Sequence, residues 1–304
     1  MVLERFAAYR PEIETRINRY FDDLDGRLDL PWWTEELTRE FRAFSTKGKL
    51  VRGGLLLLAY ELFNRNDRVL EAPLDAAAAL EIFQSAILIQ DDIMDRDEKR
   101  RGVAATHVRL AESFDAHTGE SLASCIVDAA FFSSYDLLAQ MDVDEQVLRD
   151  VIRFYSLELT KLGLAQMEDV ALAASDRVPQ RSDIETVLIE KSGRYSFSLP
   201  LVMGAMIAGA PERRGFLEAF GERIGLIFQV RDDELALFGD SEVTGKPVGG
   251  DVREGKKTLF WYELEQAVTD EDRAVLDSIY GDDDASDADV QRIMALFEKH
   301  EVRS

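Results

Sequence analysis

The chain has 304 residues, a length that allows about two domains, and 46% of them are hydrophobic. With 59 acidic and 36 basic residues the formal net charge is −23, which excludes the broad basic face of a nucleic-acid-binding protein. A dense acidic surface that is poor in lysine is typical of a high-salt cytosol, where salt screens self-repulsion, so we expect a halophilic source. The single cysteine, Cys125, excludes an intrachain disulfide, and its small apolar neighbours predict a buried core thiol.

Apolar residues recur at helical spacing in most segments, and no long run alternates as a half-buried strand would. The sequence therefore predicts an all-α protein. Its helices should be separated at four proline-containing pairs and at the segment 239–255, which is rich in glycine and proline. The pairs are Leu30-Pro31, Ala72-Pro73, Val178-Pro179 and Ala210-Pro211.

The apolar stretches are interrupted by charge before about 18 residues, so no integral membrane segment is expected. The N-terminus has no secretory signal pattern, which favours a cytoplasmic protein. Because acidic and basic segments spread along the chain would have to converge on one cavity, a single helical domain over residues 1–304 is preferred to two.

The first basic group along the chain lies in the segment 47–52, where Lys49 and Arg52 are three residues apart and share a helical face. A second follows in the segment 96–102, where Arg100 and Arg101 precede a glycine that can turn the backbone. The planar fork of arginine suits phosphate oxygens. Later lysines stand beside glycine or serine at Lys191, Lys246 and Lys256, and Lys257 follows the last of these. A single cluster of this kind can equally be solvated surface, and their number favours an anionic ligand.

Two apolar stretches end in acidic motifs, at residues 91–95 (Asp-Asp-Ile-Met-Asp) and at residues 232–233 (Asp-Asp). At about 3.6 residues per turn, Asp91 and Asp95 stand one above the other on a helix and can bind the same hard cation. Mg²⁺ takes a few carboxylates and completes its shell with waters and substrate phosphates, which fits paired acids. The alternative for any one pair is a solvated helix end, and the apolar residues before it and arginines after it favour a site.

Taken in order, these motifs resemble the trans-isoprenyl diphosphate synthases, an all-α family with two aspartate-rich motifs on facing helices. The likeness runs from Lys49 to Lys257. The matching residues are Lys49, Arg52, Gln84 and Arg101 for the isopentenyl diphosphate site, Asp91, Asp95 and Arg100 for the allylic diphosphate site, and Gln166, Asp169, Lys191, Ser192, Gln229, Lys246 and Lys256 in the later motifs.

The resemblance implies a single-domain helical bundle around a central cavity, the isoprenoid synthase fold, in an enzyme that acts as a homodimer. It implies that isopentenyl diphosphate is condensed head to tail with allylic diphosphates. Mg²⁺, as three ions, would be held by Asp91, Asp95 and Asp232. The departing diphosphate would be stabilised by Lys191, Gln229 and Lys246.

Three departures from the family pattern are visible. Ala236 stands where many members carry a third aspartate of the second motif, which active geranylgeranyl-type members also lack. Val127 and Ala165 replace glycines at helix-packing positions.

Product length should depend on Ala86 and Ile87, the residues that lie about one helical turn below Asp91. Members with short products place an aromatic ring at this depth, whereas Ala86 leaves the passage open. Phe83 is the next bulky residue and could be the floor, or could simply pack in the core. The sequence thus predicts a twenty-carbon geranylgeranyl product, with twenty-five or fifteen carbons as alternatives.

Three rival functions use related features. A class I terpene cyclase also needs an aspartate motif and Mg²⁺, but it has no use for a second diphosphate site, so Lys49, Arg52, Gln84 and Arg101 count against it. A non-catalytic partner subunit would not need the intact first motif. A purely structural helical protein would leave the acids beside apolar stretches unexplained.

Overall fold

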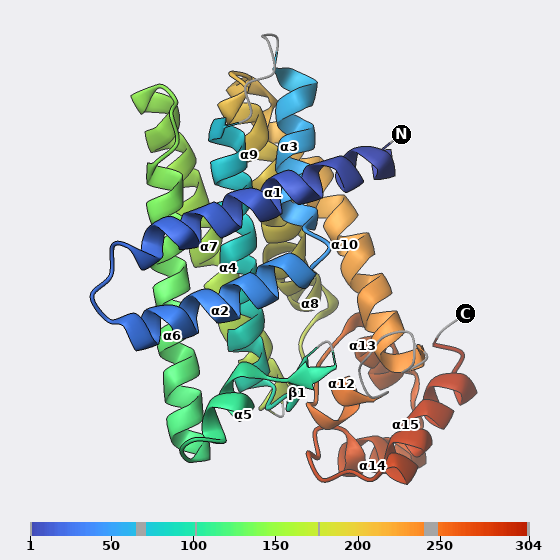
Figure 1. Cartoon of the computed structure of the whole chain (residues 1–304). Helices are drawn as coiled ribbons and strands as arrows, with labels where there is room; N and C mark the ends of the chain where they lie inside the picture. The colour runs from blue at the N-terminus through green and yellow to red at the C-terminus, as the bar shows by residue number, and fades with distance from the viewer. Residues whose placement is uncertain (1, 65–70, 101, 176, 240–248, 303–304) are drawn as a thin grey trace. The chain divides into compact units, whose positions relative to one another are not determined.

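Figure 1 shows the computed structural model, which describes residues 2–64, 71–100, 102–175, 177–239 and 249–302. Within these residues the strands are β1 (Lys99–Arg100) and β2 (Val103–Ala104), a short antiparallel pair, and the other regular elements are helices. The predicted all-α fold is confirmed. The chain forms two compact units, unit 1 (Met1–Leu157 and Ser196–Ala219) and unit 2 (Glu158–Tyr195 and Phe220–Ser304). The single domain over residues 1–304 and its central cavity stay predictions.

Unit 1 is built around α4, which contacts α1, α2, α3, α6 and α9. Four consecutive alanines of α4, residues 76–79, are completely buried, so neighbouring helices cover it on every side. Their small side chains allow these helices to approach closely. The helices of this unit are α1 (Val2–Asp25), α2 (Pro31–Lys47), α3 (Val51–Phe63), α4 (Glu71–Met94), α5 (Thr106–Ala111), α6 (Ala116–Ala139), α9 (Leu199–Ile207) and the short 3₁₀ turn η2 (Pro211–Arg213).

Unit 2 has its own apolar core, in which Phe297 packs edge-on against Phe238 with ring centroids 5.4 Å apart. Thr258, Thr269 and Ser286 each accept a hydrogen bond from the backbone at the start of α13, α14 and α15, which fixes where these helices begin. The helices of this unit are α8 (Arg181–Leu188), α12 (Gly250–Arg253), α13 (Leu259–Ala267), α14 (Asp270–Ile279) and α15 (Asp287–Lys299). The helices α7 (Glu145–Ala173) and α10 (Arg214–Phe238) and the π-helix η1 (Ile189–Ser198) have residues in both units.

Proline marks the helix boundaries much as predicted. Pro31 is the first residue of α2 and Pro211 the first of η2, positions where proline loses no intrahelical hydrogen bond. Pro73 lies in the first turn of α4, and Pro179 lies between α7 and α8. Most of the predicted break at 239–255 is outside the described residues.

The structure bears on two expectations, the absence of a membrane segment and the buried cysteine, and it corrects the second. The helices α4 and α6 each contain an 18-residue window with a mean hydropathy of 1.4, long and apolar enough to cross a membrane by composition alone. In α4 78% of that window is buried inside the fold, as in the core helix of a globular protein. Cys125 is exposed, whereas its neighbours Ala123 and Ile126 on α6 are buried. The prediction of a core thiol was wrong because Cys125 shares the solvent-facing side of α6 with the exposed residues Ser121, Ser124 and Asp128.

Candidate active site

The first aspartate motif lies at the C-terminal end of α4. The backbone N–H of Asp95 donates to the carbonyl oxygen of Asp91 at 2.8 Å, so the helical turn continues through the motif. Arg96 then adopts a left-handed backbone conformation (φ +54°), which ends the helix. The side chains of Asp91 and Asp95 are half-buried on the same helical face, where a hard cation can reach both.

Arg100, on β1, folds back onto this motif. Its guanidinium donates hydrogen bonds to Asp92 and, at 3.3 Å, to Asp97, and its Nη2 lies 3.6 Å from a carboxylate oxygen of Asp91. Burial raises the pKa of the Asp92 carboxyl, Arg100 opposes this rise, and the charges of Asp97 and Asp91 add to it. The arginine predicted to bind the allylic diphosphate therefore already lies beside the aspartates.

Asp92 is a site residue that the sequence reasoning missed. Its side chain is fully buried, and within the described residues its Oδ2 atom has no hydrogen-bond partner. A buried carboxylate of this kind is costly unless it is paired, so its contact with Arg100 anchors the loop that follows α4. The sequence could have indicated this role, because Asp92 directly follows Asp91 and adjacent residues of a helix point to different sides.

The residues predicted for isopentenyl diphosphate lie where α3 meets α4. The backbone N–H of Gly53 donates to the buried carboxylate of Glu81 at 2.8 Å, which places the start of α3 one turn from Gln84. Arg52 donates to Ser196 Oγ at 2.6 Å, and Lys49 is exposed. Within the described residues the Oε1 atom of Gln84 is buried without a hydrogen-bond partner. Arg101, the remaining predicted member, is outside the described residues.

Unit 2 gathers the later motif residues. Lys191 Nζ donates to Asp169 at 2.6 Å, and Ser192 Oγ donates to Gln229 Oε1 at 2.5 Å. Gln229 in turn donates to Asp233 at 2.8 Å. Lys191 is thus paired with Asp169, and Ser192 and Gln229 are joined to Asp233 in a separate chain of hydrogen bonds.

The two acids of the second motif differ in environment. Asp232 is exposed, whereas Asp233 is buried. Burial raises the pKa of Asp233 to about 7, the hydrogen bond from Gln229 opposes this rise, and neighbouring carboxylates add to it. The buried Asp233, which sequence reasoning did not single out, holds the amide of Gln229, while Asp232 is open to a cation.

Lys256 lies three residues after the end of α12 (256 − 253). Its Nζ is 2.5 Å from Glu254 Oε2, and its carbonyl oxygen accepts a hydrogen bond of 2.7 Å from the hydroxyl of Tyr280. Burial raises the pKa of Tyr280 well above its usual value, and the charges of Asp251 and Asp233 raise it further. Lys256 is therefore part of an acidic neighbourhood that includes the second motif. Lys246 is outside the described residues.

The residues predicted to limit product length lie in the middle of α4. Ala86 is completely buried and Ile87 is half-buried. The ring of Phe83 stacks on Phe131 of α6 with centroids 4.6 Å apart, and it meets the ring of Tyr155 of α7 edge-on at 5.9 Å. Phe83 thus belongs to a wall of three aromatic rings below the first aspartate motif.

Comparison with known proteins decides the family. The model of the polyprenyl synthetase family matches residues 34–297. The chain belongs to this family. A relative named geranylgeranyl diphosphate synthase, from Saccharolobus solfataricus, is 29% identical over 86% of this chain and 76% of its own length. Another, named geranylfarnesyl diphosphate synthase, from Aeropyrum pernix, is 32% identical over 70% of this chain and 65% of its own length.

The solved structures agree with this assignment. A geranylgeranyl pyrophosphate synthase from Corynebacterium glutamicum, complexed with isoprenyl diphosphate and magnesium, has a TM-score of 0.89 at 27% sequence identity. The match covers 97% of this chain and 87% of that one. This polyprenyl synthetase is therefore a prenyltransferase with the all-helical isoprenyl diphosphate synthase fold.

The donor set of this polyprenyl synthetase fits Mg²⁺, on which the family generally depends. Among the described residues no three acidic, histidine or cysteine side chains are gathered into a ready-made metal cage. Mg²⁺ does not require one, because it usually binds one or two carboxylates and completes its shell with waters and substrate phosphates. Asp91 and Asp95, one helical turn apart, offer such a pair.

Proposed function

We propose that this polyprenyl synthetase condenses isopentenyl diphosphate with allylic diphosphates to give mainly geranylgeranyl diphosphate, the twenty-carbon product. The arrangement at the end of α4 carries this proposal, because Asp91 and Asp95 share one face beside Arg100, and fully buried Ala86 lies one turn deeper. Relatives named for twenty- and twenty-five-carbon products support a product in this range.

By the family resemblance, Asp91, Asp95 and Asp232 would hold Mg²⁺, as three ions. Mg²⁺ held by these carboxylates would supply the positive charge that neutralises the allylic diphosphate as it leaves. Arg100 contributes fixed positive charge on the same side. Lys49, Arg52, Gln84 and Arg101 hold the diphosphate of isopentenyl diphosphate without metal.

The bond changes need no base from a side chain. The allylic C–O bond breaks towards the diphosphate, and the double bond of isopentenyl diphosphate attacks the resulting cation to form the new C–C bond. A proton is then lost to the departed diphosphate, which Lys191, Gln229 and Lys246 stabilise, while Ser192 and Lys256 are further substrate-binding residues. Apolar walls such as the Phe83 ring cluster exclude water, which would otherwise trap the cation.

One assay separates this proposal from its rivals. Pure protein is incubated with labelled isopentenyl diphosphate, an allylic primer and Mg²⁺, and the products are separated by chain length. Elongation supports the proposal, a cyclic hydrocarbon would identify a terpene cyclase, and no turnover would favour a non-catalytic partner subunit. The same reaction without divalent cation should give no product.

We also propose a cytoplasmic homodimer from a halophilic source. The net charge of −23 supports the high-salt cytosol, since such a charge is tolerated best where salt screens it.

Exposed apolar side chains support the homodimer. Phe132 of α6 and Leu157 of α7 are 74% and 51% exposed, and large exposed apolar side chains favour burial against a second copy.

Lys49→Ala and Arg52→Ala should raise the KM for isopentenyl diphosphate by about tenfold or more, because each removes a charge-assisted hydrogen bond to that diphosphate. The KM for the allylic substrate should change little. Arg100→Ala should show the opposite preference, because Arg100 lies beside Asp91. Steady-state kinetics with each substrate varied in turn measures both effects. Equal changes for both substrates in all three variants would contradict two distinct diphosphate pockets.

Ala86→Phe should shorten the main product to fifteen carbons, because a ring at this buried position blocks the chain one turn below Asp91. Phe83→Ala should lengthen it by removing one ring of the aromatic wall. Chromatography of the dephosphorylated products reads out the chain length. An unchanged product in Ala86→Phe would show that this face of α4 does not line the path of the growing chain, and that Phe83 only packs in the core.

A further inference from the structure

The π-helix η1 presents two residues of the proposed site to two different helices. Lys191 contacts α7 through Asp169, and Ser192 contacts α10 through Gln229. The backbones of η1 and α10 are packed closely, since a Cβ on Gly225 of α10 would lie 2.1 Å from the Cα of Gly193 on η1. A π-helix is rare and is often found at functional sites. A side-chain contact to both α7 and α10 would fix the position of its ten residues along these two helices.

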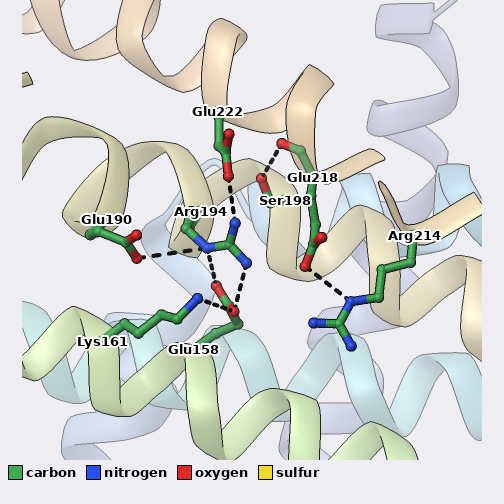
Figure 2. Close-up of polar contacts among 8 residues, drawn as sticks. All are labelled: Glu158, Lys161, Glu190, Arg194, Ser198, Arg214, Glu218 and Glu222. Atoms are coloured by element: carbon green, nitrogen blue, oxygen red, sulfur yellow. Dashed lines mark hydrogen bonds and ion pairs between the residues drawn. The ribbon is translucent and has the colours of Figure 1, made fainter. Parts of the chain in front are cut away.

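Arg194, three residues after Lys191, makes contacts to both helices (Figure 2). Its Nε and Nη2 donate to the two carboxylate oxygens of Glu158 on α7, each at 2.7 Å. Its Nη1 donates to Glu222 on α10. The guanidinium is buried, and its bidentate geometry allows only one orientation against Glu158. The motifs that predicted the site did not include this residue.

Removal of Arg194 would leave a buried carboxylate, Glu158, without its main charged partner. The side chain of Glu158 is completely buried and also accepts a hydrogen bond of 3.1 Å from Lys161. Glu190 lies 3.6 Å from Arg194 (Figure 2). Burial would raise the pKa of Glu158, but the hydrogen bonds and charges of Arg194 and Lys161 bring it below its usual value. Glu158 is therefore a charged group inside the protein, held in place by its fork with Arg194.

The contacts of Arg194 and those of the site lie on the same helix faces. Glu158 and Asp169 are eleven residues apart on α7 (169 − 158), about three turns, so they point to the same side. Glu222 and Gln229 are seven residues apart on α10 (229 − 222), about two turns, and share a face as well. Any slip of η1 that moves Arg194 along α7 or α10 must move Lys191 and Ser192 with it.

We propose that Arg194 is a positioning residue: its fork to Glu158 and its bond to Glu222 fix the register of η1 between α7 and α10. In this register Lys191 and the Ser192–Gln229 pair are presented to the departing diphosphate. This inference rests on the proposed function of Lys191 and Gln229. Arg194 itself touches neither substrate nor metal, and it acts through these residues.

Arg194→Ala tests the inference against a matched control. Arg16→Ala also removes an arginine from a buried carboxylate, Asp75, in unit 1. Arg194→Ala should lower kcat about 10- to 100-fold, because a small displacement of positioned groups is costly. The KM for isopentenyl diphosphate should stay within about twofold. Arg16→Ala should lose a similar amount of thermal stability and keep its kcat. Added guanidinium should restore part of the activity of Arg194→Ala only.

Two further measurements keep the inference testable if Arg194→Ala folds poorly or if the chain does not elongate allylic substrates. Glu222→Gln removes the charge of a half-exposed partner, so it should fold, and it should lower kcat in the same direction by a smaller factor. Hydrogen exchange followed by mass spectrometry should show faster amide exchange in residues 189–198 of both variants and no change in residues 71–94.

The outcomes separate the two proposals. A wild-type protein without elongation activity would overturn the proposed function, and the exchange measurement would still test Arg194. Unchanged exchange in residues 189–198 would overturn the positioning role. If the wild type is active, the positioning role would also be overturned by a kcat in Arg194→Ala that falls no further than in Arg16→Ala.

Discussion

Asp91→Ala and Asp95→Ala should each lower kcat about a thousandfold or more and leave the fold intact. In the proposed assignment each variant removes a Mg²⁺ ligand next to the diphosphate that leaves. The several kcal/mol that a metal contributes at such a position correspond to losses of this size. The fold should survive because both side chains are half-buried at the end of α4 and fill no closed core. Single-turnover rates measure the effect, and circular dichroism checks the helical content. Asp232→Ala should behave similarly.

The loop that follows α4 supplies the control. Glu98 is an exposed acid seven residues after Asp91 (98 − 91), and Glu98→Ala removes one negative charge from the same region. Its kcat should stay close to that of the wild type, since an exposed carboxylate outside the motif has no assigned role. If Asp91→Ala and Glu98→Ala had similar rates, the assignment of the metal ligands would be wrong.

Gly225→Ala should destabilise the protein by about 1–3 kcal/mol, the usual cost of adding a methyl group to a fully packed contact. The new Cβ would lie 2.1 Å from the Cα and 2.8 Å from the N of Gly193, and backbone atoms cannot rotate away as a side chain can. Either α10 or η1 has to shift. Because Lys191 and Ser192 are on η1, kcat should fall as well. Chemical denaturation measures the stability, and steady-state kinetics measures kcat.

Gly163→Ala is the matched control for this prediction. Gly163 lies within α7, and a Cβ at this position would meet nothing within 4 Å. Alanine is a better helix former than glycine by up to about 1 kcal/mol, so this substitution should stabilise the protein. A loss of stability in Gly163→Ala equal to that in Gly225→Ala would mean that the close approach of η1 to α10 is not the cause.

The helical architecture could be predicted because short sequence patterns indicate where helices start and which residues share a helical face. Pro31 and Pro211 mark helix starts through their fixed backbone geometry, and the spacing of Asp91 and Asp95 places them one turn apart wherever that helix lies. The pairing of Lys191 with Asp169 joins two motif residues that are 22 positions apart (191 − 169). The sequence identified both residues as candidates, but only the fold shows that they touch.

Other features follow from packing that no local pattern reveals. The close packing of η1 on α10 depends on the contact of Gly193 with Gly225, two glycines 32 positions apart (225 − 193). The role of Asp92 depends on a hairpin that returns Arg100 to the end of α4. The exposure of Cys125 could not be inferred, because α6 carries apolar side chains on its outer face too, such as Phe132.

The contacts of Arg100 with the first aspartate motif link two binding events. An anion that binds Arg100 must compete with Asp92 and Asp97, which hold the guanidinium, and with the charge of Asp91 nearby. A divalent cation on Asp91 withdraws negative charge from that competition and so strengthens anion binding. Thermodynamic reciprocity then requires the bound anion to tighten the cation by the same factor. We therefore expect metal and diphosphate each to strengthen the other's binding at the end of α4.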